Sequence, residues 1–313
     1  MTPAMTKPDV RFQEVLDRLS SMSVENYYNP YRMFEWPDEL PGDMWWMSPT
    51  LTTTYGTDIA EELTQEQLRV LSRYESINFY SLNVHGIREL LIEVTKRIHT
   101  AEFAVPSRFF HHFIGEENEH MWFFAEFCLR YGAKIYKQPR GGAETILPPN
   151  AESLLVFARI LIFEELVDHF NSQMALDKDL HDTIRQINRI HHQDESRHIA
   201  FGRELVRTLF EDFRSQATGE ELAQVGDYLK RYMSFSFESL FNPQAYRDAG
   251  VGKPLEVRRR LLEGPRRPEF EQRVFRKTLS FLAKNGILGD KDHVSPHRRR
   301  PRPALSRSGS ART

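Results

Sequence analysis

The chain has 313 residues, a formal net charge of -2 and a hydrophobic content of 40%, which are the values of an ordinary soluble globular protein. The near-zero charge gives no sign of a nucleic-acid-binding protein. The single cysteine, Cys128, excludes an internal disulfide framework and a cysteine-ligated zinc or iron–sulfur site, and it fits a reducing cytoplasm.

Residues 1–63 are predicted to form an irregular, aromatic-rich segment that packs on the rest of the protein. The beginning of the chain lacks the apolar core of a signal peptide, and a short helical pattern covers only residues 12–19. Residues 24–63 then combine many aromatic side chains with prolines and show no clear period. Aromatic side chains at this density need a surface against which they can be buried.

Residues 64–290 show helical periodicity, and almost no stretch alternates with the period of two that a half-buried strand needs. Capping boxes at Thr64 and Thr218 predict two helix starts. Four long helices are expected at about 64–100, 106–131, 151–176 and 180–213. A fifth helix is expected to about residue 240, then a loop over 242–268 and a last helix that ends near Gly286.

These patterns predict an all-α fold, followed by a basic, disordered tail over residues 291–313. The longest apolar run, at 154–163, is interrupted by Arg159 and is too short to cross a bilayer. We therefore expect a cytoplasmic protein that binds neither membranes nor nucleic acid.

Two copies of the motif Glu-x-x-His carry the chemistry of the sequence. Glu117 and His120 lie in the second long helix, and Glu195 and His198 lie in the fourth. Residues three apart share one face of a helix, so each motif presents a carboxylate and an imidazole to the same point. Two such motifs on facing helices, each joined by a Glu from another helix, form the dimetal site of ferritin-like bundles.

The other two long helices can each supply that additional Glu. Glu164 and Glu165 lie in the middle of an apolar stretch of the third helix, where a bare carboxylate is costly unless it is paired or binds a metal. In the first helix, Glu89 and Glu93 are one turn apart on one face. The order of the motifs predicts a ferritin-like four-helix bundle core with additional helices.

Three further residues are placed to support the ligands. Metal-bound imidazoles usually donate their second N–H to a carboxylate, and Glu116 and Asp194 each precede a ligand Glu. Arg197 could pair with such a carboxylate. His191 lies four residues before Glu195 on the same helix face, which makes it a candidate third imidazole ligand.

Carboxylate-rich sites with imidazole suit iron or manganese better than copper or zinc. The expected cofactor is therefore a pair of iron ions, with manganese as the alternative, and the expected co-substrate is O2. Many aromatic residues surround the motifs in the sequence, and a dry, apolar pocket beside the metals favours controlled oxidation of an organic substrate.

The two motifs with their neighbours resemble those of di-iron oxygenases and acyl desaturases. The finer pattern His191-x-x-x-Glu195-x-x-His198 resembles the AurF-type p-aminobenzoate N-oxygenase family, which has an extra histidine ligand at that place. The resemblance covers about residues 65–290. It implies that Glu164 rather than Glu165, and Glu89 rather than Glu93, bind metal together with His191.

The resemblance further implies oxidation of an arylamine to a hydroxylamine and a nitro compound in secondary metabolism, with electrons from an external donor or reductase. It places a carboxylate-anchoring arginine at Arg273, and we expect a small-molecule amine substrate and a homodimer. One alternative is a di-iron hydroxylase or desaturase that acts on a C–H bond. An alternative from another class is an iron-storage or iron-sensing protein, which extra residues on both sides of the bundle disfavour.

Overall fold

The computed structural model describes residues 10–139 and 148–289, and these residues form helices and no strand. A single isolated backbone bridge joins Trp45 to Leu180. The prediction of an all-α fold is therefore confirmed, whereas the tail at 291–313 lies outside the described residues. No described helix combines the length and the apolar character that are needed to cross a bilayer.

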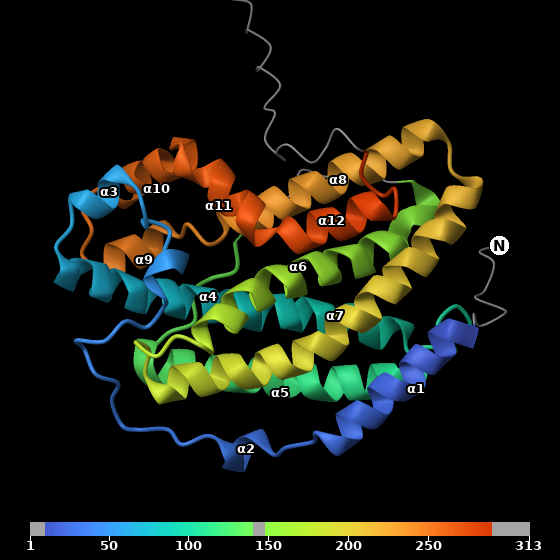
Figure 1. Ribbon diagram of the computed structural model, residues 1–313, viewed down its shortest axis with the longest axis horizontal. Helices are drawn as coiled ribbons and strands as arrows, with labels where there is room; N and C mark the ends of the chain where they lie inside the picture. Colours follow the sequence, from blue (N-terminus) through green and yellow to red (C-terminus); the bar gives the residue numbers. More distant parts are fainter. Residues whose placement is uncertain (1–9, 140–147, 290–313) are drawn as a thin grey trace, which may run out of the picture.

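Four long helices form the central bundle, as Figure 1 shows. They are α4 (Gln65–Arg97), α5 (Ser107–Gly132), α6 (Glu152–Met174) and α7 (Asp182–Gln216). The short turn η2 (Pro149–Ala151) precedes α6 after a long connection. Phe110 near the start of α5 stacks on Phe157 near the start of α6, so these two helices run in the same direction. One long crossover between two antiparallel pairs is the topology of ferritin-like bundles.

Local signals set the ends of the bundle helices. Thr64 and Gln67 exchange the two hydrogen bonds of a capping box, as the sequence predicts. The residue in the left-handed conformation that ends α5 is Ala133, with φ of 53°. A Cβ at Gly132 would stand 2.8 Å from the Ile77 side chain, so this glycine permits close packing of α5 on α4.

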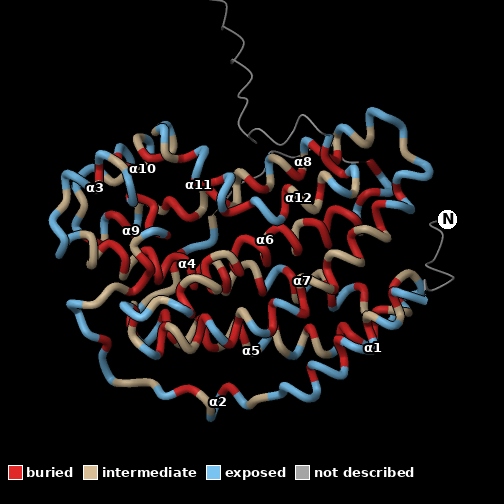
Figure 2. The backbone as a smooth tube through the Cα atoms, viewed as in Figure 1, coloured by how far each residue is buried: buried red, intermediate tan, exposed pale blue. Residues whose placement is uncertain are grey.

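The segment before the bundle packs along α5. It contains α1 (Val10–Glu25), α2 (Pro30–Met33), η1 (Pro49–Leu51) and α3 (Asp58–Glu61). The Tyr31 and Trp122 rings are 4.5 Å apart between centroids, and Phe34 lies 5.2 Å from Phe123. Figure 2 shows the exposed outer faces of this segment and the buried faces of the central helices.

Additional helices follow the bundle, and here the sequence prediction is partly wrong. They are α8 (Gly219–Glu238), α9 (Pro243–Asp248), α10 (Pro254–Glu263), α11 (Arg266–Val274) and α12 (Arg276–Lys284). The expected loop at 242–268 contains α9 and α10, which span too few turns to show a period. Asn242 caps α9 by accepting a hydrogen bond from the Gln244 N–H. The last helix is divided at the buried Phe275.

Candidate metal centre

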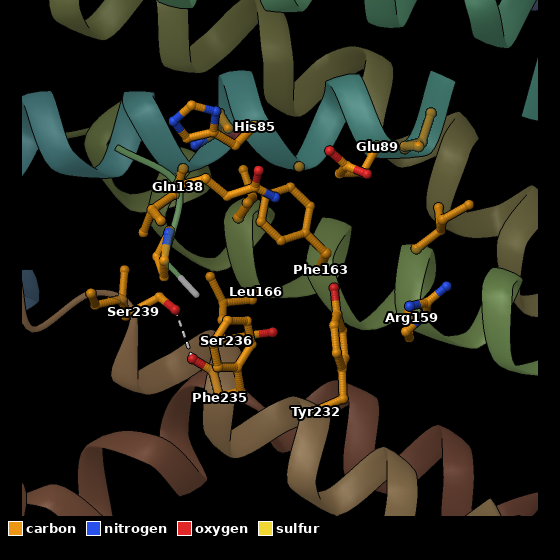
Figure 3. A pocket seen from close by; sticks show the side chains of 18 of the residues that line it. His85, Glu89, Gln138, Arg159, Phe163, Leu166, Tyr232, Phe235, Ser236 and Ser239 are labelled. Atoms are coloured by element: carbon orange, nitrogen blue, oxygen red, sulfur yellow. Dashed lines mark hydrogen bonds between the residues drawn. The ribbon is translucent and has the colours of Figure 1, made fainter. Parts of the chain in front are cut away.

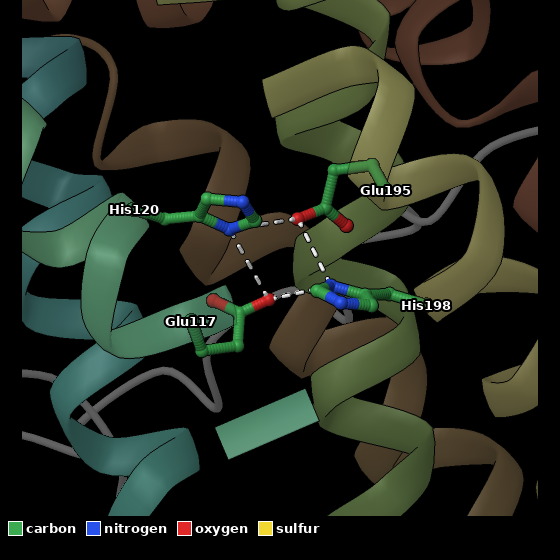
Figure 4. A group of neighbouring side chains, drawn as sticks. All are labelled: Glu117, His120, Glu195 and His198. Atoms are coloured by element: carbon green, nitrogen blue, oxygen red, sulfur yellow. Dashed lines mark ion pairs between the residues drawn. The ribbon is translucent and has the colours of Figure 1, made fainter. Parts of the chain in front are cut away.

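Four ligand-type side chains from α5 and α7 meet in the interior of the bundle. One ligand atom each from Glu117, His120, Glu195 and His198 lies within 4.8 Å of all the others. None of the four residues is more than 1% exposed. The two helices are antiparallel, so the two Glu-x-x-His faces oppose each other, as Figure 4 shows. The prediction that these motifs converge is supported by this placement.

The two imidazoles direct Nδ1 into the cluster. His198 Nδ1 lies 2.7 Å from Glu117 Oε1 and 3.5 Å from Glu195 Oε1. His120 Nδ1 lies 3.6 Å and 3.8 Å from the same two oxygens. The donor atoms therefore surround a common point, which is the arrangement that metal ligands require.

Glu164 on α6 adds a third buried carboxylate. It is 3% exposed, and neither of its oxygens has a hydrogen-bond partner among the residues that the structure describes. Burial and the charges of Glu195 and Glu117 raise its pKa well above the ordinary value. Burial and the Glu117 charge likewise raise the pKa of Glu195 to about 7. A cation between these carboxylates would remove their mutual repulsion.

His191 brings a third imidazole to the same place. Its Nε2 lies 3.1 Å from Glu195 Oε1, and its ring centroid is 4.5 Å from that of His120. Burial lowers the pKa of His191 well below its ordinary value, and the neighbouring His120 adds to this effect. The ring is therefore neutral, as a metal ligand must be. Its Nδ1 faces the Asn171 side-chain amide.

The donor set fits a pair of metal ions. Within the described ranges 10–139 and 148–289, buried nitrogen or oxygen atoms without a hydrogen-bond partner occur on every one of the six inward-facing residues: Glu117, His120, Glu164, His191, Glu195 and His198. Buried polar atoms normally have hydrogen-bond partners, so such a concentration needs an explanation. Three carboxylates and three imidazoles are the donors expected around iron or manganese.

Each of the two imidazoles of the Glu-x-x-His motifs is held by an acid from the opposite helix. His120 Nε2–H on α5 donates to Asp194 on α7 at 2.9 Å. His198 Nε2–H on α7 donates to Glu116 on α5 at 2.7 Å. Arg197 donates to both acids, at 2.8 Å to Glu116 and 2.7 Å to Asp194. This network places Glu116, Asp194 and Arg197 in the supporting positions that the sequence suggested.

These contacts determine the protonation states of Asp194 and His120. Burial by itself raises the pKa of Asp194, but the hydrogen bond from His120 and the charges of His120 and Arg197 hold it well below its ordinary value. Asp194 is therefore ionised. A charged acceptor fixes the proton of His120 on Nε2 and leaves Nδ1 for the metal.

The contact between Tyr28 and Asp194 could not be predicted from any pattern in the sequence. The Tyr28 hydroxyl, from the segment between α1 and α2, donates to Asp194 Oδ2 at 2.8 Å. Phe113 and Phe124 cover the other side of the imidazoles, with ring centroids 4.5 Å from His198 and 4.8 Å from His191. The part of the chain before the bundle thus contributes to the surroundings of the centre.

Glu89 is not brought to the centre. Its side chain is 54% exposed and pairs with Arg88 at 3.0 Å. The other expected candidate on α4, Glu93, pairs with Lys96 and Arg97. The flanking Ile87 and Leu90 are buried, so α4 turns Glu89 away from the bundle interior.

Glu75 is the buried glutamate of α4, and it does not face the centre either, because its carboxylate accepts a hydrogen bond from the Thr53 N–H. On α6, Glu165 is bound by Arg203 at 2.7 Å and by the Thr278 hydroxyl at 2.6 Å, which leaves Glu164 as the available ligand.

Arg273 also lies elsewhere. It is an exposed residue of α11 that donates to the Thr50 carbonyl oxygen at 3.0 Å and lies over the Phe270 ring. It lines neither the centre nor the cavity of about 570 Å³ between α4, α6 and α8, which Figure 3 shows.

The family model described as p-aminobenzoate N-oxygenase AurF matches residues 9–286 of the chain. The matched range includes all six inward-facing residues and the acids that support them. No curated protein matches the chain.

Proposed function

The chain belongs to the AurF family of p-aminobenzoate N-oxygenases, and on that basis we propose that it uses two iron ions and O2 to oxidise an organic amine. The substrate we favour is an arylamine or a related amine, with a hydroxylamine or nitro compound as the product. The observation that carries the proposal is the set of six buried ligand residues whose inward atoms have no hydrogen-bond partner in the described part of the chain.

The proposed ligands come from three of the four bundle helices. Glu117 and His120 come from α5, whereas Glu195, His198 and His191 come from α7 and Glu164 from α6. Two bound irons would supply the activation of O2 and the transfer of electrons. The protein residues hold the metals, orient the imidazoles through Asp194 and Glu116, and exclude water with the aromatic shell.

The extra imidazole favours N-oxygenation over the alternatives. His191 is buried and directs Nε2 to Glu195, so it adds a third imidazole to the five residues here that fit the ferritin-like pattern of Glu and Glu-x-x-His ligands. A desaturase-like site would not need this nitrogen. Burial lowers the pKa of His191 and so keeps the ring neutral, and the contact with Asn171 fixes its orientation.

The test is metal analysis of the purified protein, followed by reaction of the reduced, iron-loaded protein with O2 and a panel of arylamines. We expect about two irons per chain, and hydroxylamine or nitro products detected by mass spectrometry. The variant His198→Ala is the control, because it removes a ligand. No bound metal after anaerobic iron loading, or oxidation without any change in the amine, would contradict the proposal.

A further inference from the structure

The acids that support the two Glu-x-x-His imidazoles are bound in the same way on both sides of the centre. His198 Nε2–H donates to Glu116 Oε2, and Arg197 donates to Oε1 of the same carboxylate. On the other side, His120 Nε2–H donates to Asp194 Oδ2, and Arg197 donates to Oδ1. Each acid therefore offers one oxygen to an imidazole and the other oxygen to the guanidinium.

Tyr28 removes this equivalence. Its hydroxyl donates to Asp194 Oδ2 at 2.8 Å, and the same oxygen accepts the N–H of His120 at 2.9 Å. Of the residues whose placement the structure gives, none provides Glu116 with a third hydrogen bond. The carboxylate oxygen that supports His120 is therefore shared between two donors.

The direction of the hydrogen bond from Tyr28 is fixed. Burial and the charge of Asp194 raise the pKa of Tyr28 far above its ordinary value, so the hydroxyl keeps its proton. Asp194 is ionised and has no proton to give. A neutral phenol beside an ionised carboxylate can only donate.

Two helices hold Tyr28 in place. It lies between α1, which packs on both α5 and α7 (Figure 1), and α2. Asn29 caps α2 by accepting a hydrogen bond from the Tyr31 N–H at 3.0 Å, and the Tyr31 ring packs on Trp122 of α5. The position of the Tyr28 hydroxyl is therefore set by the packing of this segment on the bundle.

Sharing of the oxygen weakens the support that Asp194 gives to His120. A carboxylate that accepts the second N–H of a metal-bound imidazole makes the imidazole a stronger electron donor. The Tyr28 hydroxyl takes up part of the charge on Oδ2, because a hydrogen bond to an ionised acceptor is strong. Less charge remains for the His120 N–H. A weaker donor stabilises the oxidised metal less, which raises the reduction potential.

We propose that Tyr28 is a positioning residue of the metal centre, which acts through Asp194 and His120 and raises the reduction potential of the metal that His120 binds. The inference rests on the proposed function, because only a redox-active metal gives this contact a consequence for the chemistry. It assigns the segment before the bundle a part in setting how easily the centre is reduced.

The first test is an anaerobic redox titration of the iron-loaded protein, with reduced iron measured by Mössbauer spectroscopy. Tyr28→Phe keeps the ring and removes only the hydroxyl. We expect it to lower the potential of one iron by about 59 mV, which is about a tenfold change in the one-electron equilibrium and matches the loss of one charged hydrogen bond. Tyr27→Phe, at a neighbouring ring that is 71% exposed, is the matched control and should leave both potentials unchanged.

The second test needs no metal. In metal-free protein that carries isotope-labelled histidine, NMR detects the imidazole N–H protons, and a stronger hydrogen bond moves such a proton signal downfield. We expect Tyr28→Phe to move the His120 Nε2–H signal downfield and to leave the His198 signal in place. A loosening of the segment around Tyr28 would instead weaken the bond from His120 and move its signal upfield.

A ring-fluorinated tyrosine in place of Tyr28 is a stronger hydrogen-bond donor, so it should raise the potential, and it remains informative if Tyr28→Phe does not fold. Potentials that are unchanged or higher in Tyr28→Phe, an equal change in Tyr27→Phe, or a His120 signal that does not move downfield would overturn the inference. Absence of bound iron would overturn the proposed function and the inference together. Expected potentials without oxidation of any amine would contradict the proposed function alone.

Discussion

His120 on α5 and Asp194 on α7 are joined by a hydrogen bond of 2.9 Å, and the same two helices carry its counterpart from His198 to Glu116. Each imidazole is thus oriented by an acid on the opposite helix. Arg197 connects the two acids. The packing of α5 on α7 and the geometry of the metal centre are therefore determined together.

Asp194→Asn is predicted to weaken metal binding about 10- to 100-fold, the usual effect of losing a carboxylate that supports a ligand. The amide keeps the shape but removes the charge that fixes the His120 proton on Nε2, and it leaves Arg197 with one acid fewer. The measurement is competition for Mn²⁺ or anaerobic Fe²⁺ against a chelator of known affinity. Asp182→Asn, an exposed change in the first turn of the same helix, is the control.

His191→Ala is predicted to lower metal affinity and to alter the Mössbauer spectrum of the iron-loaded protein, because it removes a nitrogen donor from one metal. The adjacent His192 provides a matched control, since its partly exposed ring pairs with the buried Asp168 of α6 and is not part of the ligand cluster. Identical spectra for His191→Ala and the unchanged protein would instead make His191 a packing partner of Asn171.

The sequence was sufficient to predict the bundle, because Thr64 begins a long helix and two Glu-x-x-His motifs repeat on separate helices. It also located Glu164, whose apolar neighbours make an unbound carboxylate costly. It did not indicate that the Glu89 side chain lies outside the cluster, because flanking Ile87 and Leu90 indicate that this part of α4 is buried but not which face meets the bundle. Side chains two residues apart on a helix point in directions about 200° apart, so the burial of Ile87 does not fix the direction of Glu89.

Two further gaps have different physical causes. Tyr28 contacts Asp194 across 166 residues of chain, and the surrounding segment has no period from which its position could be inferred. The short helix α9 packs against α4, and α10 packs against α9, so local sequence alone did not indicate these helices.

Glu89→Gln is predicted to leave the metal content of the protein unchanged, whereas Glu164→Gln should reduce it. The first residue is exposed and paired with Arg88, and the second is buried with both oxygens free to bind metal. Metal analysis of the two variants, loaded and washed in parallel, makes the comparison. A loss of metal in Glu89→Gln would restore the expectation that α4 supplies a ligand.

Glu75 is predicted to make the stability of the protein depend on pH. Its side chain is buried on α4, where it accepts hydrogen bonds from the Thr53 N–H at 3.1 Å and from the Thr53 hydroxyl. Burial raises the pKa of Glu75 from about 4.5 to about 7, although the bonds from Thr53 oppose this rise. The folded state thus binds a proton that the unfolded state has released between these two pH values.

The stabilisation from this proton is complete below about pH 4.5 and is lost as the pH rises to about 7. Glu75→Gln cannot ionise, so its free energy of unfolding relative to the unchanged protein should rise across this window, by at most about 3 kcal/mol, and level off above it. Urea unfolding at a series of pH values measures the difference, with the exposed Glu66→Gln on the same helix as the control. A difference that stays constant with pH would mean that the pKa of Glu75 is the same in the folded and unfolded states, so that the contacts from Thr53 offset its burial.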